Sequence, residues 1–113
     1  MKIVQEKISI DELKDMAKNM FGDLVKAVVD VEKKIMVVEA GLHSDEEGLL
    51  LQNGSQQQNL WGINLYPEKQ DDSWIEFDSM INLRPTQENR SRGIENPKIR
   101  KKIIEIVNKL VLR

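Results

Sequence analysis

The stretch LVKAVVDVEKKIMVVEA, residues Leu24 to Ala40, decides the fold because two valine-rich runs in it flank a charged tripeptide. Valine is enriched in strands, and two such runs joined by Glu32-Lys33-Lys34 are typical of a β-hairpin. We therefore predict strands at about residues 24 to 32 and 35 to 40. The first strand alternates in polarity, so one of its faces is expected to join a core. The apolar residues on that face are Val25, Ala27, Val29 and Val31.

Helix signals lie on both sides of this hairpin. Ser9-Ile10-Asp11-Glu12 matches a capping box, in which the serine and glutamate side chains satisfy the first free backbone N–H groups. The apolar spacing that follows predicts a helix at about residues 10 to 21, ended by Gly22. Near the C-terminus, Asn96 is a favourable N-cap and Pro97 a favourable first residue of a helix at about residues 97 to 112. Both helices carry an apolar stripe that is expected to pack on the sheet.

The middle of the chain predicts a shorter helix and a second pair of strands. A second capping box, Ser44-Asp45-Glu46-Glu47, predicts a helix that runs through Leu51 and ends at Asn53-Gly54. LWGINLYP and SWIEFDSMINLRP then alternate as two strands joined by a turn-rich segment. If the apolar face of each strand points to the core, the antiparallel register is restricted, because paired residue numbers must then add up to an even number. Ile63 would pair with Phe77 or Ser79, for example.

A short first strand is expected at Lys2 to Ile8, and the resulting element order β-α-ββ-α-ββ-α predicts an α+β fold in a single domain, residues 1–113. Because hairpins join most strands, we expect a mostly antiparallel sheet of four to five strands with the helices packed on one face. The other face would be open and polar, and a site is expected there. Its residues would be Lys26, Asp30, Glu32, Asn64, Tyr66, Trp74, Glu76, Asp78, Asn82 and Arg84.

The composition excludes several classes of protein. With 40% hydrophobic and 32% charged residues the chain is ordinary for a soluble globular protein, and the absence of cysteine excludes disulfide scaffolds and thiolate metal sites. The start, MKIVQEKISIDELKDM, is charged where a signal peptide is apolar, and no window reaches membrane-spanning length. We therefore expect no membrane association and a cytoplasmic location. No glycine-rich phosphate loop, nucleophile elbow or zinc spacing occurs, so the sequence identifies no cofactor.

Positive charge is concentrated late in the chain. Residues 84–102 carry a net charge of +5 and residues 1–83 a net charge of −8, within a total of −2. Cations in the first turns of the last predicted helix oppose the positive N-terminal end of its dipole. This placement is unfavourable by itself, and a bound anion would compensate it.

The arginines of INLRPTQENRSRG, residues 81–93, are therefore the leading site candidates. Arg84, Arg90 and Arg92 lie at or after the end of a predicted strand, and arginine matches the oxygens of phosphate or carboxylate bidentately. Asn82 and Asn89 would add neutral contacts, and the last helix would add N-terminal amides. The leading hypothesis is a binding protein for a phosphate- or carboxylate-bearing ligand or partner.

A structural role is the alternative for the same arginines. Arg84 would then pair with Glu76 or Asp78 along the sheet, while Arg90 and Arg92 would hold the loop through carbonyls and acids. Under either hypothesis an extended nucleic acid is not the expected partner, because the acidic remainder of the chain would repel a long phosphate backbone. A small anionic ligand is expected instead.

Two further hypotheses come from other features. His43 is the only histidine, and as a general base or metal ligand beside Asp45, Glu47 and Asp78 it would suit a metal-dependent hydrolase. Such a site needs about three converging ligands; otherwise His43 is a helix-entry residue and the acids suit a first helical turn. A homodimeric interaction module is the other hypothesis, since a single sheet leaves edges to be covered.

The segments LHSDEEGLLLQNGS, LWGINLYP, WIEFDSMINLRP and NRSRG occur in this order. Over almost its whole length the chain thereby resembles a family of small prokaryotic proteins catalogued as a domain of unknown function. The resemblance implies a stand-alone prokaryotic domain. It implies no activity, ligand or catalytic residue.

Overall fold

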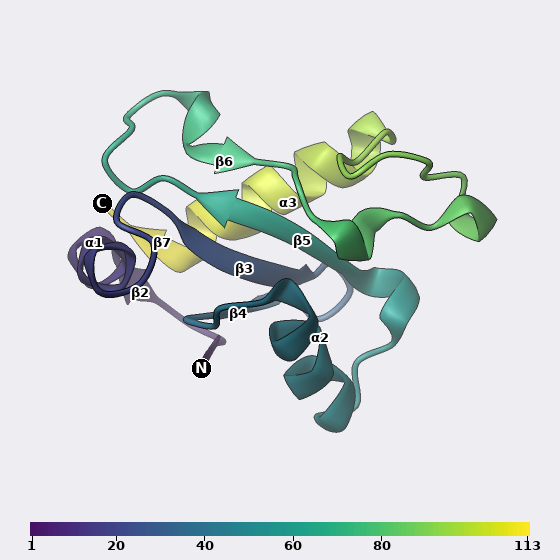
Figure 1. Cartoon of the computed structure of the whole chain (residues 1–113), viewed down its shortest axis with the longest axis horizontal. Coiled ribbons are helices and arrows are strands. Elements are labelled where there is room, and N and C mark those ends of the chain that lie inside the picture. The colour runs from purple at the N-terminus through teal and green to yellow at the C-terminus, as the bar shows by residue number, and fades with distance from the viewer.

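The protein is an antiparallel five-stranded sheet with three α-helices, in a computed structural model that describes all 113 residues (Figure 1). The sheet order is β1-β4-β3-β5-β6, and a separate parallel pair joins β2 to β7. The predicted α+β class is confirmed. None of the helices is both long enough and apolar enough to cross a membrane. The elements are β1 (Lys2–Val4), β2 (Ile8–Ser9), α1 (Ile10–Asn19), β3 (Val25–Asp30), β4 (Ile35–Val38), α2 (His43–Gln52), β5 (Leu60–Leu65), β6 (Ile75–Glu76), α3 (Pro97–Leu110) and β7 (Val111–Leu112).

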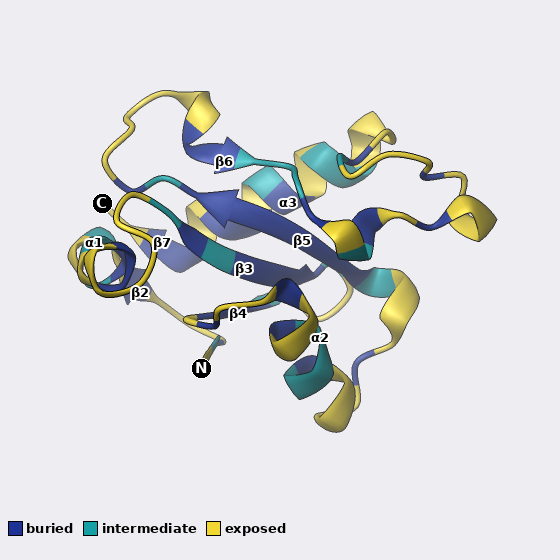
Figure 2. Ribbon diagram, viewed as in Figure 1, coloured by how far each residue is buried: buried dark blue, intermediate teal, exposed yellow.

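Helices cover both faces of the sheet. The predicted apolar face of β3 packs against α1 and α3 in the main core, which includes Ala27, Leu13 and Ile103, all fully buried. The expectation that the helices share one face holds for these two only. On the other face Leu50 of α2 packs on Val28, in a smaller cluster with Val37 and Leu60. Figure 1 shows α2 in front of the sheet and α3 behind it, and Figure 2 shows the strands between them as the most continuously buried part.

The predicted hairpin forms with shorter strands. β3 ends at Asp30 because this residue is buried and turns its carboxylate onto the turn. Asp30 Oδ1 accepts the N–H groups of Glu32 and Lys33, both at 2.9 Å, and its Oδ2 accepts the Ser55 hydroxyl at 2.7 Å. Asp30 was expected on an open polar face; it is instead part of the interior that α2 and its following loop cover.

The two flanking helices begin where the sequence predicts. The Ser9 side chain accepts the Glu12 N–H, and the Asn96 side chain accepts the Lys98 N–H with Pro97 in the first turn. α1 ends two residues early, followed by Gly22 with a φ of +95°. α3 ends at Leu110 because Val111 turns into strand β7 and pairs with Ile8.

The last predicted strand is the main departure. The register is confirmed, since Asn64 pairs with Glu76 and Leu65 with Ile75, but β6 contains only two residues. The chain then forms a 3₁₀ turn at Met80–Asn82, where the Asn82 side chain replaces the strand's backbone as the hydrogen-bonding partner of β5. This turn brings residues 78–81 over the start of α2.

Candidate functional site

Arg84 is buried and bonded within the protein. Its Nε donates to the Ile81 carbonyl at 2.9 Å, and one terminal nitrogen donates to the Gln57 carbonyl at 2.9 Å. The other terminal nitrogen donates to the Leu60 carbonyl and lies 3.3 Å from the Glu47 carboxylate. Burial lowers the pKa of Arg84, and the charge of Glu47 opposes that shift. Each guanidinium nitrogen therefore has a protein partner, and Arg84 ties the loop to β5 and α2.

The acids expected beside Arg84 have other partners. Glu76 Oε1 accepts the Asn64 amide at 2.9 Å and the Tyr66 hydroxyl at 3.1 Å. Asp78 Oδ1 accepts the Nε of Arg92 at 2.7 Å. The ion pair of Arg84 is thus made with Glu47 of α2, 37 residues away in sequence, rather than along the sheet.

Asn82 and Asn89 also point into the protein. The Asn82 amide is bonded to both backbone groups of Gly62, each at 2.9 Å. The Asn89 Nδ2 donates to the carbonyls of Asn82 at 2.7 Å and Gly93 at 2.8 Å, and its Oδ1 accepts the Glu95 N–H at 2.8 Å. Both side chains shape the loop and offer no free group to a ligand.

Arg90 and Arg92 remain at the surface, and they separate. The Arg90 side chain is exposed and has no hydrogen-bond or ion-pair partner; only its backbone N–H is bonded, to Glu95 at 2.5 Å. Arg92 is held through its Nε by Asp78, which leaves its two terminal nitrogens without a protein partner. The structure does not gather the predicted arginines into one cluster, and of the three only Arg92 lines the hollow beside the start of α2.

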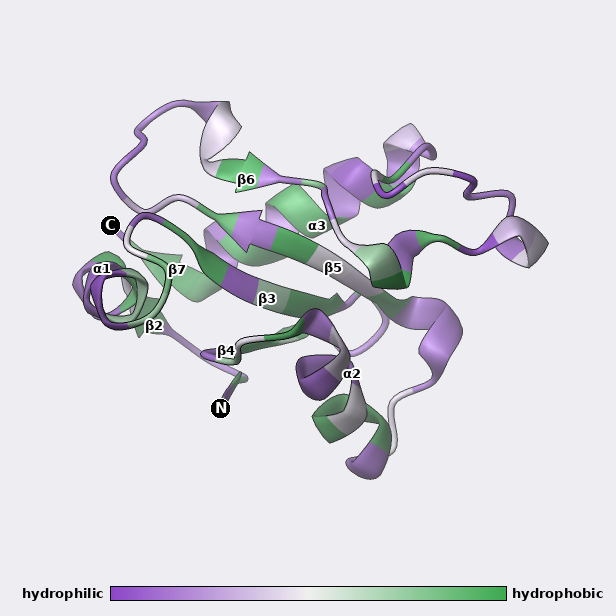
Figure 3. Cartoon of the chain, in the orientation of Figure 1, coloured by the Kyte–Doolittle hydropathy of each residue, from purple (hydrophilic) through white to green (hydrophobic).

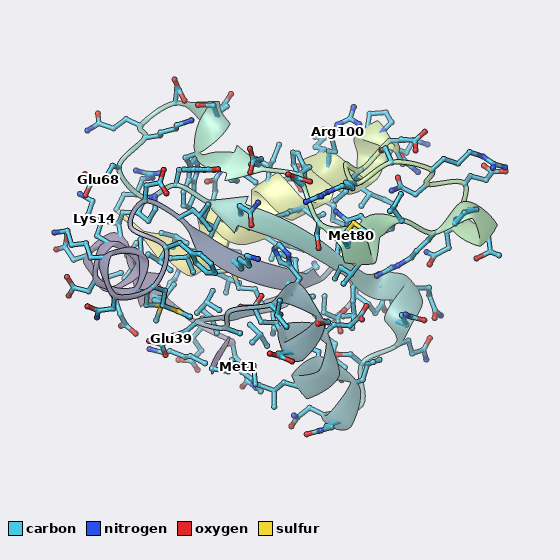
Figure 4. All side chains as sticks on the ribbon, in the orientation of Figure 1. Met1, Lys14, Glu39, Glu68, Met80 and Arg100 are labelled. Carbon is cyan, nitrogen blue, oxygen red and sulfur yellow. The ribbon has the colours of Figure 1, made fainter.

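That hollow, which we call the α2 hollow, has a volume of about 190 Å³ and lies between the start of α2, the middle strands and the segment 78–81. Met80, labelled in Figure 4, lies at its rim on the turn in front of the sheet. The volume suits an ion or a small charged group rather than a drug-sized ligand. Its lining residues are Lys26, Leu42, His43, Ser44, Asn64, Asp78, Ser79, Met80, Ile81 and Arg92.

The first turn of α2 opens into this hollow without a side-chain cap. The predicted cap at Ser44 is wrong: the helix begins at His43, and the N-cap residue is Leu42, which has no polar side chain. The first bonded amide is that of Asp45, which donates to the Leu42 carbonyl at 3.2 Å. The N–H groups of His43 and Ser44 have no acceptor in the protein, so the positive end of the helix dipole is left unsatisfied here.

His43 is fixed in one orientation. Its Nε2 lies 2.8 Å from the Ile63 carbonyl, and because a carbonyl only accepts, Nε2 carries the proton. Burial lowers the pKa of His43, and the nearby charge of Lys26 lowers it further. The imidazole is therefore neutral at pH 7, and its Nδ1 is an acceptor.

A buried polar atom lies next to His43. The Asn64 side chain is 7% exposed, and its Oδ1 has no hydrogen-bond partner although its Nδ2 donates to Glu76. Asn64 favours the charged form of His43, as does the carboxylate of Asp78. An anion bound beside His43 would oppose the effect of burial, and together with Asn64 and Asp78 it would favour a second proton on the imidazole, at Nδ1.

Cations outnumber anions around the hollow. Lys26 has no ion pair, and its Nζ lies 5.1 Å from the centroid of the Phe21 ring. Arg92 and Asp78 offset each other in charge while the pair fixes the arginine in place. With His43 neutral, the hollow has a formal net charge of +1 together with two unsatisfied amides. It is chemically suited to hold an anion.

The acids proposed with His43 do not form a metal centre. Asp78 lines the same hollow as His43, but Glu47 is bound to Arg84 and Asp45 is exposed outside the lining. No group of three histidine, aspartate or glutamate side chains converges anywhere in a way that could hold a metal ion.

The sequence did not indicate Ser44 as a site residue, and it placed Lys26 and Asn64 only among the ten residues of the polar face on which a site was expected. Lys26 and Asn64 belong to the polar face inferred from alternation, and they pair across β3 and β5. Only the position of α2 over this face turns that pair into a site. The sequence signal was a helix start preceded by Gly41 and Leu42, neither of which can cap the helix with a polar side chain.

The fold and the site define a small α+β domain with a cationic hollow at a helix N-terminus. Over residues 2–110 the chain matches the model of the family described as "Protein of unknown function (DUF5674)", and it belongs to that family. Neither curated proteins nor solved structures gave a match. The family resemblance is confirmed, and function has to be argued from the residues themselves.

Proposed function

We propose that the protein binds a small ligand through one phosphate or carboxylate group held in the α2 hollow. The observation that carries the proposal is that Arg92 and Lys26 line the same hollow as His43 and Ser44, whose backbone N–H groups have no acceptor. Helix N-termini and arginine forks are both recurrent binders of such groups. Arg92 is already oriented by Asp78, so little side-chain entropy is lost on binding.

The rim of the hollow indicates the rest of the ligand. Leu42 is 55% exposed and Met80 is 62% exposed, on opposite elements that border the hollow. Methionine adapts its shape to varied apolar partners. The proposed ligand therefore carries an apolar body next to its charged group, as an aryl phosphate or a hydrophobic carboxylic acid does.

This proposal keeps the anion-binding function inferred from the sequence and keeps Arg92 as a ligand residue. Asn82 and Asn89 support it indirectly, because their amides bond to the backbone of Arg92 and Gly93, whereas the bonds of Arg84 do not reach Arg92. Arg90 lies outside the hollow. A cytoplasmic location and a prokaryotic origin belong to the same proposal, and the origin rests on the family resemblance.

The test is the melting temperature in inorganic phosphate, phenyl phosphate and benzoate, against sodium chloride at matched ionic strength. A ligand at about 100 times its Kd adds about 2.7 kcal/mol, on the order of 10 °C for a domain of this size. We expect phenyl phosphate to bind more tightly than phosphate, and both shifts to be lost in Lys26→Ala/Arg92→Ala. Arg90→Ala is the control, because it removes an exposed arginine outside the hollow. Unchanged shifts in the double variant would overturn the proposal.

The other two hypotheses have less support. The hydrolase would need a metal site, and no three candidate ligands converge. For the homodimer, the free edges are β1 and β6, which are only three and two residues long and so offer few backbone groups to a partner. Light scattering at high protein concentration distinguishes a monomer from a dimer.

A further inference from the structure

We propose a second site, on the far side of the sheet from the α2 hollow, that binds a compact ligand carrying several phosphate groups. The site is a groove of about 960 Å³ between α3, the connection from β1 to β2 and the turn from β3 to β4. We call it the lysine groove because seven of its twelve lining residues are lysines. It shares no lining residue with the α2 hollow.

The charge of the groove is strongly segregated from the rest of the protein. Its seven lysines face two glutamates, Glu6 and Glu105, which gives a net charge of +5. The whole chain has 17 basic and 19 acidic residues, so the remainder has ten basic and seventeen acidic residues and a net charge of −7. An ordinary solvated surface intersperses the two signs. This groove concentrates one sign in a concave place, where the potential is focused.

The lysines converge from three distant parts of the chain. Lys98, Lys101 and Lys102 come from the first turns of α3, and Figure 3 shows the hydrophilic colour over this part of the helix. Lys7 precedes β2, and Lys34 belongs to the hairpin turn. α3 has no acidic residue in its first turn, so these cations oppose the helix dipole without local compensation. A bound anion supplies the compensation that the helix lacks.

The ammonium groups are available to a ligand. The protein has four ion pairs, and none of them includes a lysine of the groove. Lys7 Nζ donates to the Lys109 carbonyl at 2.6 Å and Lys33 Nζ to the Asn53 carbonyl at 3.2 Å, which position these two side chains without neutralising them. Even Glu105, on the same face of α3, leaves the lysines unpaired.

The lining chemistry selects the class of ligand. The groove has no aromatic residue for stacking the bases of a single strand, and its two apolar residues, Ile106 and Leu110, are almost wholly buried. Protein interfaces are depleted in lysine and enriched in aromatic residues and arginine, and membrane-binding helices present large apolar side chains. What remains is a ligand recognised by charge alone. The lysine groove has the volume of a small-molecule site, and the rest of the protein is acidic. Both features favour a compact polyphosphate over a long duplex.

Isothermal titration with orthophosphate, pyrophosphate and tripolyphosphate tests this inference. We expect the affinity to rise with each added phosphate and to fall steeply with sodium chloride. Lys98→Glu/Lys101→Glu should weaken tripolyphosphate binding by about tenfold or more, because two attractive charges become repulsive. The variant is expected to fold at least as well as wild type, since acids at a helix N-terminus are favourable.

Two controls separate the sites. Lys18→Glu/Lys69→Glu makes the same change in net charge outside the groove and should leave tripolyphosphate binding unchanged. Arg92→Ala should also leave it unchanged, so failure here and failure of the α2 hollow are distinguishable. Equal affinity for orthophosphate and tripolyphosphate, or wild-type binding by Lys98→Glu/Lys101→Glu, would overturn the inference. Tighter binding of a 16-base-pair duplex, lost in that variant, would overturn it in favour of a nucleic acid.

Discussion

The Asn82 side chain forms two hydrogen bonds with the backbone of Gly62, accepting its N–H and donating to its carbonyl, each at 2.9 Å. Asn82 is fully buried, and its Nδ2 also donates to the Arg92 carbonyl at 2.9 Å. The Asn82 amide therefore takes the place of a strand beside β5, and it also positions the backbone of Arg92, a residue of the proposed anion site. The site depends on this pair although neither residue lines the hollow.

Replacing Asn82 with alanine should destabilise the protein by about 2–4 kcal/mol, because two buried backbone groups of Gly62 lose their partners. It should also weaken anion binding, since the Arg92 backbone loses its anchor. Urea denaturation measures the stability, and Asn108→Ala on the exposed side of α3 is the matched control. Loss of less than about 1 kcal/mol would show that the strand re-pairs without the amide.

Gly62 should not tolerate alanine. A Cβ at this position would lie 2.5 Å from the Ser79 Cβ and 2.6 Å from its Oγ, far inside contact distance. We expect Gly62→Ala to lower the free energy of unfolding by about 1–3 kcal/mol or more, as overpacking does. Part of the lost stability should be recovered in Gly62→Ala/Ser79→Gly, which removes the clashing side chain. Thermal denaturation of both variants checks this; an unrescued double variant would mean that the strain lies elsewhere, for example at Ile81.

The variant Arg84→Lys tests whether Arg84 has a structural role or binds the ligand. Lysine cannot reproduce the fork that reaches Ile81, Gln57 and Leu60, so buried carbonyls lose donors and we expect a loss of about 2–4 kcal/mol in unfolding free energy. Phosphate affinity, measured well below the melting temperature, should stay within about twofold of wild type. A selective loss of phosphate binding with unchanged stability would instead make Arg84 a ligand residue.

Glu46 should make stability depend on pH. The side chain is fully buried, only its Oε2 accepts a hydrogen bond, from Ala40 N–H, and burial raises its pKa to about 9. The folded state keeps this proton while the unfolded state releases it above pH 4.5, so stability falls as pH rises from 4.5 towards 9. Relative to pH 4, the loss at pH 7 is on the order of 3 kcal/mol.

Glu46→Gln is the matching variant, because glutamine resembles the protonated acid and does not titrate. Its stability advantage over wild type should grow with pH across this range. His43 titrates in both proteins: its lowered pKa makes stability rise with pH below 6.5, and this contribution cancels in the difference. A difference between the two proteins that is independent of pH would show that Glu46 is already ionised.

Local signals predicted most of the fold. The hairpin, the caps at Ser9 and Asn96 and the register of β5 with β6 depend on residues near one another in sequence or on strict alternation. The side of the sheet that α2 covers was not predictable in the same way. Val28 interrupts the polar face of β3, and a single out-of-phase valine gives no sign of which helix will cover it.

The arginines show where charge patterns stop being informative. Arg84, Arg90 and Arg92 look alike in sequence, yet one is buried, one is free and one borders a hollow. The burial of Arg84 depends on carbonyls at residues 57, 60 and 81, which only the tertiary fold brings together. The alternation of INLR, residues 81–84, predicted that the strand continues. In the structure the Asn82 side-chain amide bonds to β5 in place of a strand backbone, and alternation of polarity gives no sign of such a replacement.

The most direct test of the anion site is a ¹⁵N–¹H correlation spectrum recorded during titration with phenyl phosphate at constant ionic strength. We expect the largest shifts at the amides of His43 and Ser44 and at the Nε of Arg92, with a common Kd. Shifts confined to residues 84–90, or to the lysines of α3, with His43 and Ser44 unmoved at saturation, would contradict it.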